Sequence, residues 1–236
     1  GIPYSYNSPT AYIKTNIEGT FNILEAAKNL KLKQVIVTST SEVYGTAKSK
    51  NLKESDPISA QSPYAATKIA ADQLSLSYYK SFNLPVKIIR PFNTFGPRQS
   101  LRAVIPTIVS QFIKNKKTII RVGNLKATRD FLYVEDLCSA YEKVLKSKKL
   151  FGEVVNVGSN FEVSVEEIIK KISKILNKKY KIILERKRIR PVKSEVSRLR
   201  CNNTKIKKLT KWKPRYSFEQ GLRILIKWLS KDHNLN

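Results

Sequence analysis

The apolar positions in the first part of the chain change from helical spacing to strand spacing and back. Apolar side chains recur every three or four residues over positions 16–28, which predicts a helix. Residues 35–37 form a continuous apolar run, which predicts a strand buried on both faces. Ser62 is expected to cap a long helix that begins at Pro63, and segment 84–93 is expected to be another strand. This order of strand, helix and strand is typical of a parallel sheet in an α/β fold.

The second part of the chain has a more mixed order of elements and indicates a smaller lobe built onto the sheet. Helical spacing predicts helices over 104–113, 134–147, 164–176 and 218–230. Apolar runs predict strands over 118–123, 153–159 and 181–186.

The charge of the chain is strongly positive, with 45 Lys and Arg against 18 Asp and Glu in 236 residues and a formal net charge of +27. Such an excess can indicate phosphate binding by a nucleic-acid-binding module. The lysines, however, alternate with Leu and Ile at helical spacing, as they do on solvated helix faces, and no basic motif with interleaved aromatics is present. We therefore expect no specific nucleic-acid partner. The exception is segment 185–193, whose clustered arginines suit phosphate.

Several other functional classes are disfavoured by the composition. The chain contains no Met and opens on "GIPYSYNSP", which resembles neither a signal peptide nor a helix start, so we expect it to lack its natural N-terminus. No apolar run approaches the roughly 18 residues of a membrane span, and we expect a soluble, cytoplasmic protein. Cys138 and Cys201 lack metal-ligand spacing, and the only histidine, His233, lies in a polar tail. Neither a metal site, a disulfide scaffold nor a histidine-based triad is expected.

Four hydroxyl residues and an acid, Thr38 to Glu42, follow the first predicted strand. Ligands of open α/β sheets bind beyond the carboxyl ends of the strands, so polar residues at a strand exit are candidates for a site. The alternative is a Ser/Thr-rich turn with Glu42 in water.

Tyr64 and Lys68 are the second candidate group. Their i, i+4 spacing puts both side chains on one face of the predicted helix. An ammonium beside a phenol favours the phenolate, so we expect Lys68 to lower the pKa of Tyr64 and make it a usable base.

With these motifs the chain resembles the extended short-chain dehydrogenase/reductases, in particular the nucleotide-sugar epimerases and 4,6-dehydratases. The stretches that carry the resemblance are "NIEGTFNILEAA", "VTSTSEVYG", "SPYAATK", "RPFNTFGPRQ", "TRDFLYVEDL" and "EVVNVGS". The resemblance implies a doubly wound Rossmann domain that holds NAD, a smaller C-terminal α/β lobe for a nucleotide-diphospho-sugar, and a homodimer formed through the two long helices. We assign residues 1–95 to the Rossmann domain, incomplete at its N-terminus, and 96–236 to the lobe, with 129–158 packing back on the Rossmann domain. The family's glycine-rich turn for the cofactor pyrophosphate is missing from the sequence.

Within this family, the residues after the first strand separate the reactions. Thr40, Ser41 and Glu42 resemble the Thr-(Asp or Ser)-Glu pattern of 4,6-dehydratases, with Ser41 as in the GDP-mannose branch. We expect a 4,6-dehydratase acting on UDP- or GDP-linked N-acetylglucosamine, although the group that protonates the departing hydroxyl stays open. A 4-epimerase and a UDP-glucuronate decarboxylase are the alternatives, since decarboxylases also carry a Thr-Ser-Glu exit.

The resemblance also implies roles for individual residues. Thr40, Ser41, Glu42, Tyr64 and Lys68 would be catalytic; Asn16, Ser39, Tyr64, Lys68 and Pro91 would contact NAD; Asn93, Arg102, Arg129 and Arg190 would contact the nucleotide-sugar. Asn16 has a helix N-cap as its alternative role. For Arg129 and Arg190 the alternative is a surface ion pair with an acid such as Asp130 or Glu195.

Overall fold

The computed structural model describes residues 2–114 and 118–231, and the only histidine, His233, lies outside them. The first helical segment begins earlier than its apolar spacing predicts. Helices α1 (Ile2–Asn7) and α2 (Pro9–Tyr12), a π-helical turn η1 (Ile13–Glu18) and α3 (Gly19–Asn29) follow one another closely. The expectation that the opening residues do not start a helix is therefore wrong. Proline is tolerated in a first helical turn, where its missing N–H would have no partner anyway.

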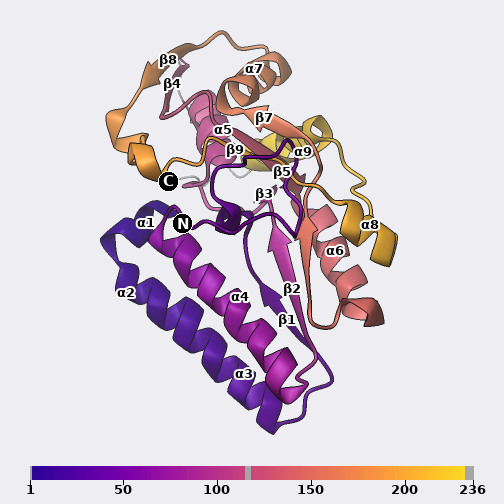
Figure 1. Ribbon diagram of the computed structural model, residues 1–236. Helices are drawn as coiled ribbons and strands as arrows, with labels where there is room; N and C mark the ends of the chain where they lie inside the picture. The colour runs from indigo at the N-terminus through magenta and orange to yellow at the C-terminus, as the bar shows by residue number, and fades with distance from the viewer. Residues whose placement is uncertain (1, 115–117, 232–236) are drawn as a thin grey trace.

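Three parallel strands form the first sheet, in the order β1 (Val35–Thr38), β2 (Val86–Pro91) and β6 (Glu153–Val157). In Figure 1, α3 and α4 (Pro63–Phe82) lie on one face of this sheet and α6 (Val134–Lys146) lies on the other. The predicted α/β class with a Rossmann-type parallel sheet is confirmed. Strand β1 is only half-buried, contrary to expectation, because it pairs with β2 alone among the described strands.

Both faces of this sheet are covered by apolar side chains from the helices. On the α3 and α4 side, Leu24 and Tyr78 pack against Val86 and Ile88. The other side includes residues of α6, α8 (Thr204–Thr210) and Trp212. Ser62 caps α4 as predicted, accepting a hydrogen bond from the Ala65 N–H at 3.1 Å. This cap fixes where α4 starts and therefore where its polar first turns lie.

The second lobe contains several short elements that the apolar pattern did not predict. Strand β5 (Thr128–Tyr133) pairs with β3 (Asn93–Phe95), β7 (Glu162–Ser164) and β9 (Arg198–Leu199). The predicted strand over 84–93 is consequently two strands, β2 and β3, which belong to different sheets. Strands of two or three residues contain too few positions for a period of two to appear in the sequence.

The remaining elements of the lobe agree with the predicted types. Strands β4 (Ile119–Val122) and β8 (Lys181–Leu184) pair in parallel. Helices α5 (Val104–Lys114), α7 (Val165–Leu176) and α9 (Phe218–Lys231) contribute to one apolar core. Short 3-10 turns, η3 (Lys148–Leu150), η4 (Arg186–Arg188) and η5 (Val192–Ser194), occur in the connections. The domain boundary between residues 95 and 96 stays a prediction. Strand β6 belongs to the first sheet and α6 lies on it, although both come after this boundary in the chain.

The expectations of no membrane span, no metal site and no disulfide scaffold concern the whole chain, whereas the structure describes residues 2–114 and 118–231. No helix within them is long and apolar enough to cross a membrane. They contain no cluster of three or more His, Cys, Asp or Glu suited to a metal ion. Cys138 is an exposed free thiol and Cys201 is a buried one.

Candidate active site

The segment that follows β1 is folded into the protein interior. Residues 39–42 are all at most 9 % exposed. The 3-10 turn η2 (Ser41–Tyr44) begins here, and the hydroxyl of its N-cap, Thr40, accepts a hydrogen bond from the Glu42 N–H at 3.3 Å. The alternative of a solvated turn with Glu42 in water is therefore wrong. A carboxylate and the hydroxyls of Thr40 and Ser41 are instead presented at the carboxyl end of a parallel strand, as a ligand site requires.

Tyr64 and Lys68 lie one turn apart on α4, beside this segment. The Tyr64 phenol is hydrogen-bonded to Thr40, and the Lys68 ammonium donates to the carbonyl oxygen of Thr38 at 2.6 Å. Burial raises the pKa of Tyr64, the Thr40 hydrogen bond opposes this, and the nearby charge of Glu42 adds to it. The expected lowering of the Tyr64 pKa by Lys68 is therefore not found. The ammonium is held at the end of β1 by this hydrogen bond.

Two guanidinium groups approach the Glu42 carboxylate from distant parts of the chain. Nε of Arg129, in β5, lies 3.9 Å from Oε1, and Nη1 of Arg190 lies 3.9 Å from Oε2. At this distance the charges attract each other without a hydrogen bond. Arg129 also pairs with Glu195 at 3.4 Å, but as a buried group rather than on the surface. Nη1 of Arg190 is buried and has no hydrogen-bond partner among the described residues, so it can still donate to an anion.

Asp130, the other acid suggested as a partner for these arginines, faces backbone groups instead. Its carboxylate accepts hydrogen bonds from the N–H groups of Ser159 and Asn160, both at 2.8 Å, and from that of Cys201 at 3.1 Å. Burial raises the pKa of Asp130 to about 6, against the effect of these bonds. Asp130 thus ties β5 to two loops and fixes the backbone from which Arg129 extends.

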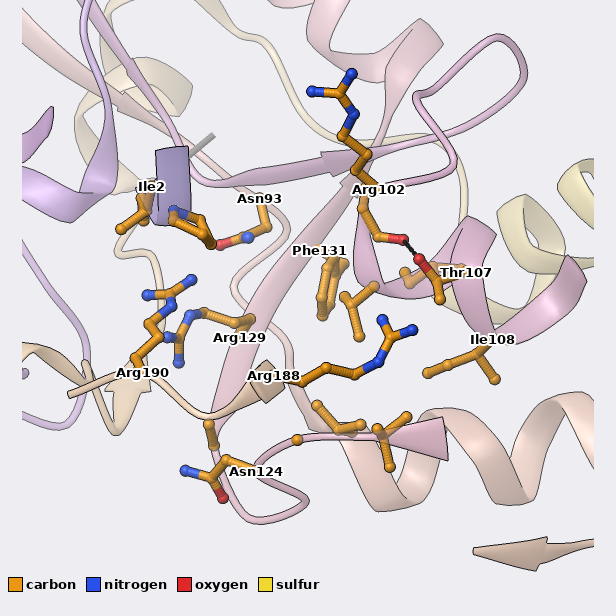
Figure 2. A pocket seen from close by; sticks show the side chains of 18 of the residues that line it. Ile2, Asn93, Arg102, Thr107, Ile108, Asn124, Arg129, Phe131, Arg188 and Arg190 are labelled. Carbon is orange, nitrogen blue, oxygen red and sulfur yellow. Dashed lines mark hydrogen bonds between the residues drawn. The ribbon is translucent and has the colours of Figure 1, made fainter. Parts of the chain in front are cut away.

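A cavity of about 870 Å³ lies beside these groups. In Figure 2, the guanidinium groups of Arg129 and Arg190 lie together, and Arg188 points into the middle of the cavity. Arg102 extends away from these three arginines. The predicted site residues in its wall are Thr40, Ser41, Glu42, Tyr64, Pro91, Asn93, Arg102, Arg129 and Arg190. Asn16, Ser39 and Lys68 do not line it. Most of the candidates therefore share one cavity, although they come from six separated stretches of chain.

The cavity wall also contains charged residues that sequence reasoning did not assign to the site. Lys187 and Arg188 belong to the basic segment 185–193, whose composition had indicated phosphate binding. Arg121 lies in β4 and had no sequence signal, while Glu195 had been considered only as an ion-pair partner. Cations outnumber carboxylates in this wall, which suits an anionic ligand.

The residues expected to contact NAD lie around the first turns of α4. The Asn16 amide donates to the Thr67 hydroxyl at 3.0 Å from within η1, so its alternative role as a helix N-cap is wrong. The Ser39 hydroxyl donates to Asp72 at 2.8 Å and is turned into the interior. Asn16, Tyr64 and Lys68 nevertheless offer an amide, a phenol and an ammonium close together, which fits the hydroxyl-rich ribose of a nicotinamide cofactor. The three groups account only for the nicotinamide half of the cofactor, because the sequence has no glycine-rich turn to hold the pyrophosphate.

Comparison with known families agrees with the arrangement of these groups. The family model described as GDP-mannose 4,6 dehydratase matches residues 1–225. The chain belongs to this family. The resemblance to the extended short-chain dehydrogenase/reductases, of the NAD-dependent epimerase/dehydratase type, is thereby confirmed.

Members of the epimerase/dehydratase family with similar sequences or structures include enzymes of two kinds. A dTDP-D-glucose 4,6-dehydratase of Dictyostelium discoideum is 37 % identical over 185 residues, which are 74 % of this chain and 42 % of the relative. The crystal structure of dTDP-glucose 4,6-dehydratase from Bacillus anthracis in complex with NAD has a TM-score of 0.82 and 35 % identity, and the match covers 93 % of this chain and 68 % of that one. UDP-glucuronic acid 4-epimerase from Bacillus cereus, in complex with UDP-glucuronic acid and NAD, has a TM-score of 0.85 and 30 % identity, with the same coverage. The chain thus spans less than half of one relative and about two thirds of two others.

Proposed function

We propose that the protein uses NAD to dehydrate a nucleotide-diphospho-sugar, as a 4,6-dehydratase. The observation that carries the proposal is the position of Glu42. Its carboxylate is buried in the same cavity as the hydrogen-bonded pair of Thr40 and Tyr64, and two guanidinium groups lie 3.9 Å from its oxygens. A 4-epimerase needs no second base, because it only removes a hydride at C4 and returns it. A dehydratase needs a base for the C5 proton, and Glu42 is suited to that role.

The residues of the chain would act in two stages. In the first, Tyr64 takes the proton of the C4 hydroxyl, while Thr40 holds the same oxygen and Lys68 supports the phenolate. Bound NAD would accept the hydride from C4 and return it at C6. In the second stage, Glu42 takes the C5 proton, which the C4 ketone has made acidic, and the bond from C6 to its hydroxyl breaks. Of the two protons taken by Tyr64 and Glu42, one leaves with that hydroxyl as water and the other returns to C5.

The substrate that we propose is UDP- or GDP-linked N-acetylglucosamine. Support comes from the volume of about 870 Å³ and from the cations along the wall, which suit a diphosphate. The buried Nη1 of Arg190 and the neighbouring Arg129 are the groups best placed to bind it. Asn93 and Arg102 would make further contacts with the nucleotide-sugar.

Two other reactions are the competing proposals. Epimerisation at C4 is supported by the family members that are epimerases, including a UDP-glucuronate 4-epimerase of Thermodesulfobacterium geofontis that is 30 % identical over 239 residues. Decarboxylation of UDP-glucuronate uses the same C4 oxidation and would leave Arg190 to bind the sugar carboxylate. All three reactions need Tyr64, but only the dehydratase needs Glu42 as the base for the C5 proton.

The decisive experiment replaces Glu42 by Gln in a version extended at its N-terminus with the family's glycine-rich turn. The substitution keeps size and hydrogen bonding but removes the base, so water loss should fall by a factor of about 10²–10⁴ while C4 oxidation continues. Tyr64→Phe should stop both steps. Single-turnover NADH absorbance and product mass would be followed with UDP- and GDP-N-acetylglucosamine and with UDP-glucuronate.

Each competing proposal has its own outcome in this assay. Undiminished water loss in Glu42→Gln would remove the role assigned to Glu42. Release of carbon dioxide from the uronate would make the protein a decarboxylase. Interconversion at C4 without any loss of mass would make it an epimerase.

We also propose that the protein is a homodimer through its long helices. Three large apolar side chains of the helical segment over 13–29 are exposed: Ile13, Phe21 and Ile23, at 44, 45 and 63 %. Exposed apolar surface of this kind is typical of an interface. Light scattering should give twice the mass of one chain, and Phe21→Lys with Ile23→Lys should halve it.

A further inference from the structure

A third charged residue continues the line of Tyr64 and Lys68 along α4. Asp72 follows Lys68 by four residues and Tyr64 by eight, so the three side chains share one face of the helix. Asp72 is completely buried, with an exposed fraction of 0 %. The proposed reaction does not use it, and it does not line the cavity.

The Asp72 carboxylate joins α4 to the ends of two strands. Its Oδ2 atom accepts a hydrogen bond from the hydroxyl of Ser39, directly after β1, at 2.8 Å. The same atom accepts from Nε of Arg90, in β2, at 3.0 Å, and Nη2 of Arg90 is 2.9 Å away. One oxygen atom therefore fixes the relative positions of a helix and two adjacent strands at the edge where the site lies.

Arg90 extends this network to the turn that carries Glu42. Its Nη1 donates to the Tyr44 hydroxyl at 3.0 Å, and its guanidinium lies 5.1 Å from the centre of the Tyr44 ring. The Tyr44 hydroxyl in turn donates to Asn156, in β6, at 2.8 Å. Since Tyr44 is the last residue of η2, Glu42 and the Asp72 pair are held by one continuous set of buried contacts.

Stability alone gives a poor reason for this arrangement. A buried ion pair loses most of its attraction to the cost of removing both charges from water, so apolar residues of similar volume often serve stability equally well. Oδ1 of Asp72 is also buried without a hydrogen-bond donor among the described residues, which adds to the cost. The gain lies in position, because Ser39 directly precedes Thr40, the partner of Tyr64.

We propose that Asp72 is a positioning residue for the reaction, which holds Thr40 against Tyr64 by joining α4 to Ser39 and Arg90. This inference rests on the proposed function, because Tyr64 is taken as the base. A shift of Thr40 by about 1 Å would cost roughly 10²-fold in rate.

The charge of Asp72 also influences the two groups that precede it on the helix. Burial lowers the pKa of Lys68, and the charge of Asp72 opposes this. Burial raises the pKa of Tyr64, and the charge of Asp72 adds to this together with Glu42 and Tyr12, while the Thr40 hydrogen bond opposes it. Eight residues of helix place Tyr64 about 12 Å from Asp72. Asp72→Asn would remove the negative charge and leave Arg90 unpaired, and both changes favour the phenolate. We expect the pKa of Tyr64 to fall.

The test compares Asp72→Asn with three other variants of the same N-terminally extended protein. We expect kcat for C4 oxidation to fall about 10- to 100-fold with KM within about twofold. NMR of tyrosine labelled at Cζ, with Tyr64→Phe to identify its signal, should show the fall in the pKa of Tyr64 without substrate or NAD. Removal of both charges in Asp72→Asn with Arg90→Gln should restore that pKa. Ser75→Ala is the matched control: Ser75 is buried on the same helix and bonds only the Ala71 carbonyl, so kcat should not change.

Loss of thermal stability with unchanged kcat and an unchanged Tyr64 titration would overturn the proposal and make Asp72 a purely structural residue. Should Asp72→Asn not fold, Ser39→Ala removes only the hydroxyl contact, and an unchanged kcat there would overturn the proposal equally. Failure of the proposed function looks different, because the unmodified protein itself would then release no water. The NMR titration would still report on Asp72 in that case.

Discussion

Replacing Lys87 tests how the first sheet is held to α6. It lies in β2, is 1 % exposed, and its ammonium donates to the carbonyl oxygens of Val144 at 2.9 Å and Leu145 at 3.0 Å, in the last turn of α6. It also donates to the Gln34 side chain at 2.8 Å and lies 4.4 Å from the centre of the Phe151 ring. The carbonyl groups in the last turn of a helix have no N–H partner within the helix, and here the Lys87 ammonium donates to two of them.

Replacement by Met keeps the length of the side chain and removes all of these contacts. Hydrogen bonds to a charged group contribute about 1.5–3 kcal/mol each, and part of this is returned because a buried charge no longer has to be desolvated. We expect a net loss of about 3 kcal/mol in the free energy of unfolding, which corresponds to about 6–12 °C in Tm for a chain of this size. Calorimetry or thermal circular dichroism would measure it.

The matched control is Lys146→Met, at the end of the same helix. Lys146 is an exposed lysine that pairs with Glu142 one turn earlier, and an exposed pair contributes little, so Tm should change by less than about 2 °C. Equal effects of the two substitutions, or a stabilised Lys87→Met, would refute the reasoning. The buried ammonium would then be replaceable by any apolar group of the same length.

Three further predictions concern pH, cofactor and charge. Burial raises the pKa of Asp130 to about 6. Between about pH 4 and pH 6 the Asp130 carboxyl is therefore protonated in the folded state and ionised in the unfolded state. The stability that the protonated carboxyl gives the folded state is lost as the pH rises through this range. Urea unfolding should therefore show a larger penalty for Asp130→Asn at pH 4.5 than at pH 7, and a constant penalty would contradict the shift. Calorimetric titration should show that the chain binds NAD more weakly than the version extended with the glycine-rich turn, even though both contain Tyr64 and Lys68; comparable affinities would contradict the need for a glycine-rich turn. Fluorescence anisotropy with duplex DNA should show only weak binding that disappears with added salt, whereas a sub-micromolar complex at physiological salt would favour a nucleic-acid function for the +27 charge.

The sequence alone was sufficient for the features that depend on neighbours along the chain. The α/β class, the long helix capped by Ser62 and the Tyr64–Lys68 pair follow from spacing and from local hydrogen bonding. The hydroxyl-rich exit of β1 could be found in the same way. The family followed from motifs that extend over most of the chain, and comparison confirmed it.

Short strands and early helical turns could not be predicted so well, because their stability comes from partners elsewhere in the chain. Strand β9 has two residues and exists because β5 pairs with it. The helical turns from Ile2 onward pack against α4, and nothing in their own sequence indicates this. The half-buried state of β1 likewise depends on which strands lie beside it, not on its apolar composition.

The site itself was decided largely by tertiary structure. Segment 185–193 indicated phosphate binding, but only folding brings Arg190 and Arg129 to opposite oxygens of Glu42. The sequence also predicted that Lys68 would lower the pKa of Tyr64, whereas burial raises it. Spacing along a helix determines which side chains lie on the same face. Solvent exclusion and charges from other segments set its pKa, and these are properties of the packed molecule.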